Sequence, residues 1–203
     1  MIAVNVTKKL PDGAVIMIGS VTEGTVAVGD AVTFAVDKAR KMDIARNHTA
    51  THLLHAALKQ VLGAHVNQAG SYVGPDRLRF DFSHFSQVTA EELKEVEAIV
   101  NEQVLAGKAV NIEELPIEEA KKKGATALFG EKYGNIVRVV TVPDFSMEFC
   151  GGSHVSNTAQ IGMFKIVSEG SSGAGVRRIE ALTGSGVLEY YKKQEALLHE
   201  AAK

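Results

Sequence analysis

The sequence predicts an α+β fold, with helices packed on a mainly antiparallel sheet. Segments in which apolar and polar residues alternate, as in strands, are mixed with segments whose apolar residues recur at helical spacing. Two predicted strands, 162–167 and 175–182, flank a loop at 168–173 rich in Gly and Ser, so they can pair as neighbours. Of 203 residues 45% are apolar and 6% aromatic, which predicts a largely aliphatic core.

The chain is expected to have three parts. Residues 1–40 carry short β-rich runs between turn signals and are predicted to form a small partial β-barrel. So few strands leave exposed edges, and we therefore expect further strands to precede them. Residues 41–184 are predicted to form the main domain, and residues 185–203 to begin a longer C-terminal helix.

The main domain is expected to open with a helix that begins at Asp43 or Asn47 and ends at Gly63. A strand is predicted at 77–82, where apolar and polar residues alternate. Thr89 opens a capping box, which predicts a second helix. The remaining predictions are strands at 110–113 and 136–142 and a short helix at 117–123.

The overall charge excludes a general attraction to polyanions. Lys and Arg number 22 and Asp and Glu 24, so any contact with RNA must come from a local patch. A single cysteine cannot form an intramolecular disulfide, and no apolar run approaches the roughly 18 residues of a membrane-spanning helix. The start of the chain has no signal-peptide pattern. We expect a soluble, cytoplasmic protein without a membrane partner.

Two short motifs predict a metal site. His48 and His52 lie four residues apart, so on a helix both reach the same side. In the second motif, Cys150-Gly-Gly-Ser-His154, two glycines let the backbone turn so that a thiolate and an imidazole converge. Either motif alone is more often structural. Together they predict four ligands around Zn²⁺.

The motifs also limit the chemistry. Four protein ligands are typical of a structural zinc ion, whereas catalytic sites usually keep one position open. Thr49 stands where helical zinc proteases carry a glutamate base, which argues against a peptidase. His55 is one turn further along the same face and is expected to pack beside the site. His65 and His84 have no partner pattern, and no role is predicted for them.

Several motifs in unbroken order resemble the editing domain of alanyl-tRNA synthetases. The resemblance covers about residues 41–184 and is carried by Arg46–His55, Arg79–Ser83, Ala127–Tyr133, Cys150–His154 and Gly175–Glu180. It implies a Zn²⁺-dependent deacylase that hydrolyses the ester bond of Ser-tRNA(Ala) and Gly-tRNA(Ala), with the tRNA 3′ end as partner. The aminoacylation core lies outside the resemblance, so this chain is not expected to charge tRNA.

The resemblance also implies roles for single residues. It makes His48, His52, Cys150 and His154 the zinc ligands and Thr51 and Gln68 the residues that shape the editing pocket. It places Arg177 near the tRNA end or the pocket wall. Arg178 is a further candidate for RNA contact, but alternation along a strand sends these two side chains to opposite faces.

The substrate explains why a hydroxyl group is expected in the pocket. Serine is larger than alanine, so a filter based on size alone cannot reject serine and spare alanine. A buried hydrogen-bond partner for the serine hydroxyl can do so. Thr51, aided by Gln68, is predicted to supply it; the alternative is that Thr51 bonds its own helix backbone.

Glu148 lies two residues before Cys150 and would share its face on a strand. It is a candidate general base or a partner of a ligand histidine, and the alternative is a solvated or ion-paired side chain. Two other functions remain open for the chain: a freestanding deacylase that acts on tRNA charged elsewhere, and a zinc-stabilised tRNA-binding module without catalysis.

Overall fold

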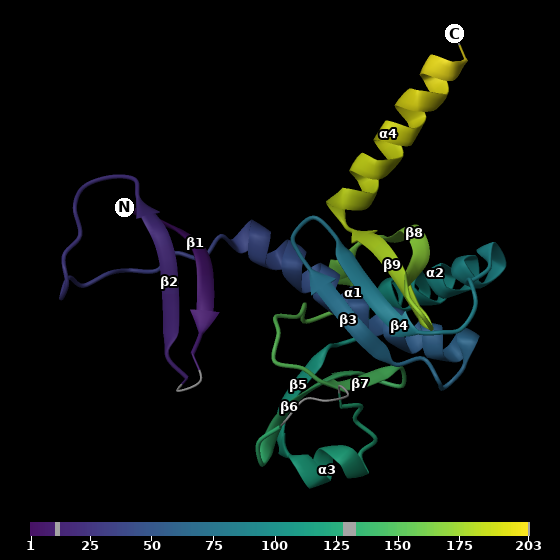
Figure 1. Cartoon of the computed structure of the whole chain (residues 1–203), viewed down its shortest axis with the longest axis horizontal. Helices are drawn as coiled ribbons and strands as arrows, with labels where there is room; N and C mark the ends of the chain where they lie inside the picture. Colours follow the sequence, from purple (N-terminus) through teal and green to yellow (C-terminus); the bar gives the residue numbers. More distant parts are fainter. Residues whose placement is uncertain (11–12, 128–132, 203) are drawn as a thin grey trace. The chain divides into compact units, whose positions relative to one another are not determined.

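The computed structural model describes residues 1–10, 13–127 and 133–202. Contacts divide the chain into two compact units, Met1–Val36 and Asp37–Lys203. The larger unit combines helices with antiparallel sheets, so the predicted α+β class is confirmed (Figure 1). The separation of residues 185–203 from the main domain stays a prediction.

The smaller unit is an antiparallel ribbon of β1 (Ile2–Lys9) and β2 (Val15–Val21), with a register shift between Val4 and Val6. Residues 22–36 contain no strand. The described residues of this unit therefore form a two-stranded ribbon, with its large apolar side chains exposed, and do not close a barrel by themselves.

The first helix, α1, spans Lys38–Leu62 and begins earlier than predicted. The Asp37 side chain accepts a hydrogen bond from the Arg40 N–H, at 3.0 Å, and so caps the helix. The predicted starts at Asp43 and Asn47 are wrong, because the charged residues before them are good helix formers. Gly63 ends the helix as predicted, with a positive φ of 113°.

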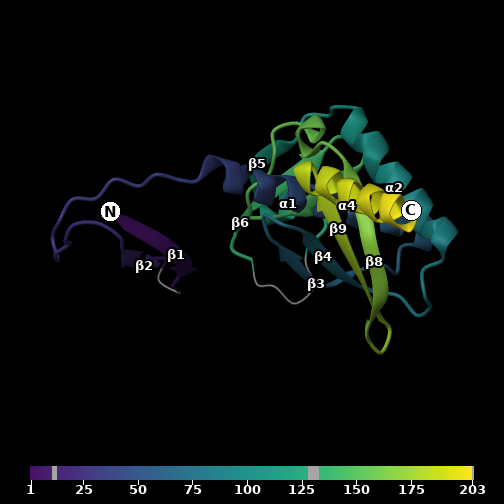
Figure 2. The same ribbon diagram turned by 90° about the horizontal axis from the view of Figure 1, so that it is seen from above.

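The main sheet has four antiparallel strands in the order β3-β4-β9-β8. The alternation predicted at 77–82 is confirmed, because Leu78, Phe80 and Phe82 are all fully buried. Helices α1 and α2 pack on each other and on this sheet (Figures 1 and 2). The bounds of the four strands and of α2 are β3 (Gln68–Val73), β4 (Leu78–Ser83), α2 (Ala90–Leu105), β8 (Phe164–Gly173) and β9 (Val176–Thr183).

The capping box at Thr89 is present, and α2 follows it. The loop predicted at 168–173 instead belongs to β8, because the Gly- and Ser-rich residues pair with β9 as far as Gly173. The reversal of the chain is left to a short turn at Ala174 and Gly175, where Gly175 has a φ of 69°.

A smaller sheet has three antiparallel strands in the order β5-β6-β7. It packs with α3 around a second apolar cluster that includes Ala120, Val137 and Phe149. A 3₁₀ helix lies between this sheet and β8 in the sequence. The bounds are β5 (Asn111–Pro116), α3 (Ile117–Lys122), β6 (Ile136–Val142), β7 (Ser146–Phe149) and η1 (Thr158–Ile161).

Asn47 fixes α1 against the main sheet. Its buried amide donates a hydrogen bond to the Gly74 carbonyl, at 2.8 Å, and its carbonyl oxygen accepts one from the Thr183 hydroxyl, at 2.7 Å. One side chain thus joins the helix to the β3–β4 turn and to the end of β9. The next residue is His48, so this joint also sets the position of the first predicted ligand.

The last helix, α4, spans Ser185–Ala201, where a helix was predicted. Val187 is its one buried residue, and the helix projects from the sheets (Figure 1). Among the helices that the structure describes, none combines the length and the apolar character needed to cross a membrane.

Candidate metal centre

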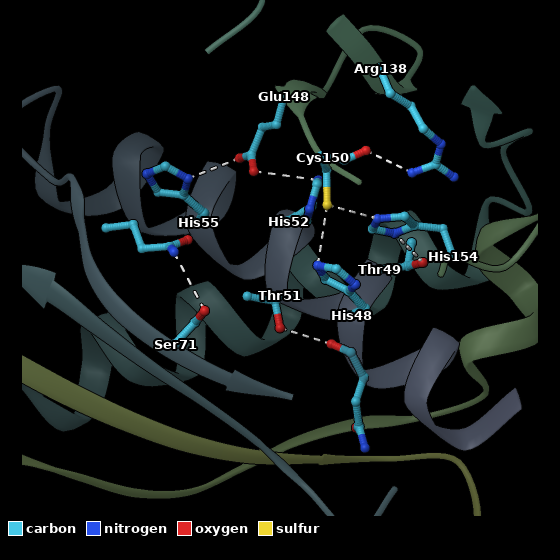
Figure 3. Close-up of polar contacts among 12 residues, drawn as sticks. His48, Thr49, Thr51, His52, His55, Ser71, Arg138, Glu148, Cys150 and His154 are labelled. Carbon is cyan, nitrogen blue, oxygen red and sulfur yellow. Dashed lines mark hydrogen bonds and ion pairs between the residues drawn. The ribbon is translucent and has the colours of Figure 1, made fainter. Parts of the chain in front are cut away.

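The two predicted motifs meet at one point. His48, His52, Cys150 and His154 each offer a ligand atom, and the four atoms lie within 4.8 Å of one another (Figure 3). Cys150 Sγ is 3.3 Å from the Nε2 atoms of both His48 and His154. In a tetrahedral zinc site, neighbouring ligand atoms are about 3.3–3.6 Å apart. This group can hold a metal ion, and the identity of the ion stays a prediction.

Arg138, on β6, holds the loop that carries the thiol. Its Nη1 donates hydrogen bonds to the carbonyl oxygens of Cys150, at 2.6 Å, and Gly152, at 2.8 Å. The Cys150 N–H in turn donates to the Arg138 carbonyl, at 3.0 Å. The sequence contains no local signal for this role, because Arg138 lies twelve residues before the motif and on another strand.

Gly152 leaves room for the ring of His48, a predicted metal ligand. A Cβ atom at this position would overlap Cε1 and Nδ1 of the His48 ring, whereas a Cβ at Gly151 would meet no atom within 4 Å. Neither glycine has a positive φ. The chain bends at Gly152. A glycine is also required there for the close approach of an imidazole, whereas a Cβ at Gly151 would meet no such obstacle.

Thr49 sets the protonation of His154. Its hydroxyl donates to the Ala45 carbonyl, at 3.0 Å, and accepts from the Val155 N–H, at 3.2 Å. The hydroxyl oxygen also lies 3.1 Å from His154 Nδ1. Since the only hydroxyl proton is used by Ala45, Nδ1 must carry the hydrogen in this contact. Nε2 is left with its lone pair toward Cys150, the tautomer that a metal requires.

Glu148, on β7, supports His52. One carboxylate oxygen accepts a hydrogen bond from His55 Nδ1, at 2.9 Å, and the other lies 3.4 Å from His52 Nδ1 (Figure 3). Only 9% of Glu148 is exposed, so the solvated alternative is wrong. Burial alone would raise the pKa of this carboxyl, but His52 and His55 lower it below its ordinary value. Glu148 is therefore an anion at neutral pH.

The three ligand imidazoles are neutral at pH 7. Burial, which disfavours the charged ring, lowers the pKa of His48 to about 4 and that of His154 to about 2. Burial also lowers the pKa of His52. Neutral rings offer lone pairs to a metal ion without first losing a proton.

Comparison with known proteins agrees with the motifs. The family described as "Threonyl and Alanyl tRNA synthetase second additional domain" matches residues 137–180. The chain is 58% identical over 196 residues to the alanine–tRNA ligase of Acetivibrio thermocellus, and 59% over 196 residues to that of Geobacillus kaustophilus. Each match covers 97% of this chain and 22% of the relative. The resemblance to alanyl-tRNA synthetases is confirmed.

A third relative, the alanine–tRNA ligase of Listeria monocytogenes serotype 4b, is 61% identical over 183 residues, which are 90% of this chain and 21% of the relative. The chain thus spans about a fifth of the length of the alanyl-tRNA synthetases that it matches. Of the motifs that carry the resemblance, residues 128–132 lie outside the described part of the structure.

The two residues expected in the editing pocket have separate partners. Thr51 is buried, and its hydroxyl donates to the Asn47 carbonyl, at 2.8 Å, as the structural alternative expects. Gln68, at the start of β3, is half-buried, and its amide nitrogen is 3.4 Å from Ser71 Oγ. Their role in the synthetase pocket stays a prediction.

The two arginines expected to contact RNA are ion-paired. Both nitrogens of the Arg177 fork bind Glu169, at 2.6 and 2.8 Å, and those of Arg178 bind Asp81, at 2.7 and 2.8 Å. The Arg177 side chain is 15% exposed and that of Arg178 is 40% exposed. Any phosphate must compete with these carboxylates, and contact with RNA stays a prediction.

The close approach of Gly152 to His48 generates a testable difference between neighbouring glycines. We expect Gly152→Ala to weaken zinc binding by at least about tenfold, because the added methyl group displaces the His48 ring. Gly151→Ala is the matched control and should bind zinc as the parent does. Competition with a chromophoric chelator measures both affinities. Equal affinities in the two variants would contradict the assignment of His48 as a ligand.

Proposed function

We propose that this chain hydrolyses the ester bond of tRNA(Ala) that carries serine or glycine by mistake, the proofreading step of protein synthesis. The observation that carries the proposal is the convergence of three neutral imidazoles and a thiol in one cluster. This cluster lies in a chain that resembles alanine–tRNA ligases over almost its whole length. The proposed partner is the aminoacylated 3′ end of the tRNA.

The donor set suits zinc. Nitrogen and sulfur ligands at tetrahedral spacing are what Zn²⁺ prefers in proteins, and here His48, His52, Cys150 and His154 would supply all four. When bound, the ion would supply Lewis acidity toward the ester or an anchor for the substrate's polar groups. With four protein ligands the coordination is complete, a feature that also favours a second candidate: a zinc-stabilised tRNA-binding module without catalysis.

Thr51 is proposed to select serine as a hydrogen-bond acceptor. Its only hydroxyl proton is given to the Asn47 carbonyl, so the oxygen has lone pairs to offer and no proton. A serine hydroxyl can donate to these lone pairs, and the methyl group of alanine cannot. Gln68 would add an amide with both donor and acceptor atoms. The difference between a satisfied and an unsatisfied partner is about 1–3 kcal/mol, or roughly 5- to 150-fold.

Glu148 is proposed to position His52 and not to act as the general base. Both of its oxygens face imidazoles, one in a hydrogen bond with His55 and the other toward His52. Carboxylates paired in this way fix the orientation and tautomer of a metal-binding histidine. A base must instead reach the attacking water, and here both oxygens already face imidazoles.

Hydrolysis of charged tRNA by the zinc-loaded chain tests the proposed function. We expect release of serine from Ser-tRNA(Ala) and glycine from Gly-tRNA(Ala), no release of alanine from Ala-tRNA(Ala), and loss of activity after chelation and dialysis. Filter-bound radiolabelled amino acid gives the rates. Binding of the tRNA without any hydrolysis would favour the non-catalytic module instead.

Substitution of Thr51 tests the selection of serine. Thr51→Val keeps the shape of the side chain and removes the acceptor oxygen, so we expect hydrolysis of Ser-tRNA(Ala) to fall by roughly 5- to 150-fold. Thr51→Ser keeps the hydroxyl and should retain most of the rate. If the valine variant deacylates Ser-tRNA(Ala) as fast as the parent does, Thr51 does not receive the serine hydroxyl.

Substitution of Glu148 separates positioning from base catalysis. We expect Glu148→Gln to lower zinc affinity by about 10- to 100-fold, because the amide holds His52 less well. Hydrolysis should then recover when free zinc is raised to saturation. The control, Glu113→Gln, changes an exposed residue of β5, at the far edge of the same sheet, and should leave affinity unchanged. A variant that binds zinc normally yet stays inactive would point to a base.

A further inference from the structure

An aromatic ladder of His65, His84 and Phe85 lies at one end of the main sheet. The His65 and His84 rings are nearly parallel, at an interplanar angle of 21° and a centroid distance of 5.2 Å. His65 and Phe85 are also nearly parallel, at 22° and 6.2 Å. A hydrogen-bonding contact of 2.9 Å joins His65 Nε2 to His84 Nδ1. No role was predicted for the two histidines because neither has a partner pattern in the sequence, and the fold brings them together.

The ladder has a fixed inner end and an open outer end. His84 lies 6.4 Å from the ring of Phe82, which is fully buried in the core. The backbone N–H of His84 also donates a hydrogen bond to the Gly175 carbonyl at the β8–β9 turn, at 3.0 Å. Phe85 is 90% exposed. An aromatic ring is stabilised by burial against another apolar surface, so an exposed ring beside two other rings is well suited to receive a further flat group.

The surroundings of the ladder suit a partner with exposed rings and hydrogen-bonding groups. Three segments meet here: 63–67 after α1, 84–88 after β4, and the β8–β9 tip at 170–175. None of them contains Asp or Glu, and they offer Asn, Gln, Ser and backbone groups for hydrogen bonds. Single-stranded nucleic acids bind where aromatic side chains stack on successive bases, usually beside cationic groups that follow the phosphates. These segments contain neither Lys nor Arg, and the Glu92 carboxylate is close enough to His84 for His84 to lower its pKa. Stacking on the bases would therefore supply the contact here.

We propose that this ladder stacks an unpaired nucleotide of the tRNA 3′ strand. This inference rests on the proposed function and assigns to it a second contact with the substrate. Gln68, expected in the pocket, follows His65 by three residues and pairs in register with Phe82. Along α1, His52 and Leu62 are ten residues apart, a rise of about 15 Å. The ladder would therefore receive a nucleotide upstream of the terminal adenosine.

Binding of an uncharged RNA tests the proposal. The probe is a stem-loop with four unpaired nucleotides at its 3′ end, each replaced in turn by the fluorescent base 2-aminopurine. We expect the zinc-loaded chain to quench the fluorescence at one or two of these positions and to bind a blunt-ended stem-loop more weakly. Phe85→Ala should bind the overhang roughly 5- to 150-fold more weakly and lose the quenching, as expected for one lost stack.

Two further variants serve as controls. Phe85→Trp keeps a flat ring and should retain both binding and quenching. Leu105→Ala removes another side chain of high exposure, 85%, at the end of α2, and should change neither. Because Phe85 is exposed, the circular dichroism and zinc content of all three variants should match the parent.

The proposal is overturned if Phe85→Ala binds the overhang as tightly as the parent, or if the blunt stem-loop binds equally well. The readout needs no hydrolysis, so the two proposals can fail separately. A chain that stacks the overhang through Phe85 but releases no serine would refute the proposed deacylase and keep the ladder. A chain that releases serine while Phe85→Ala binds normally would refute the ladder alone.

Discussion

The structure depends on bringing four metal-binding side chains together from two distant stretches of chain. His48 and Cys150 are 102 residues apart, and closing so long a loop costs conformational entropy that the contacts around the cluster must offset. Three neutral imidazoles and a thiol attract one another only weakly in water. A metal ion at this point would connect the ends of the loop directly, so that binding and folding stabilise each other.

Each half of the cluster is held by a different part of the fold. Asn47 joins α1 to the main sheet immediately before His48, whereas Arg138 joins the Cys150 loop to the smaller sheet. Glu148 connects the two halves through His52 and His55. The site therefore lies between α1, which packs on the main sheet, and β7, an edge strand of the smaller sheet. Contacts between α1 and β7 hold the two together. Selectivity at such a site comes from groups whose own positions are fixed in this way.

Sequence reasoning succeeded where the cause is local. The end of α1 at Gly63 and the capping box at Thr89 follow from residues a few positions apart, and the spacing of the two metal motifs follows from helix and loop geometry. It failed where a contact spans the fold or a local pattern is ambiguous. The charged stretch 38–41, which forms the first turn of α1, resembles a linker as much as the start of a helix. Contacts that span the fold were missed: those of Thr49 with His154, of Arg138 with the Cys150 loop, and of His65 with His84, and the close approach of Gly152 to His48.

X-ray absorption at the zinc edge of the zinc-loaded chain tests whether the two motifs bind one ion. We expect the ion to be bound by three nitrogen atoms at about 2.0–2.1 Å and one sulfur atom at about 2.3 Å, with the sulfur lost in Cys150→Ser. A shell without sulfur in the parent chain, or one that is identical in the serine variant, would contradict the convergence of the two motifs on a single ion.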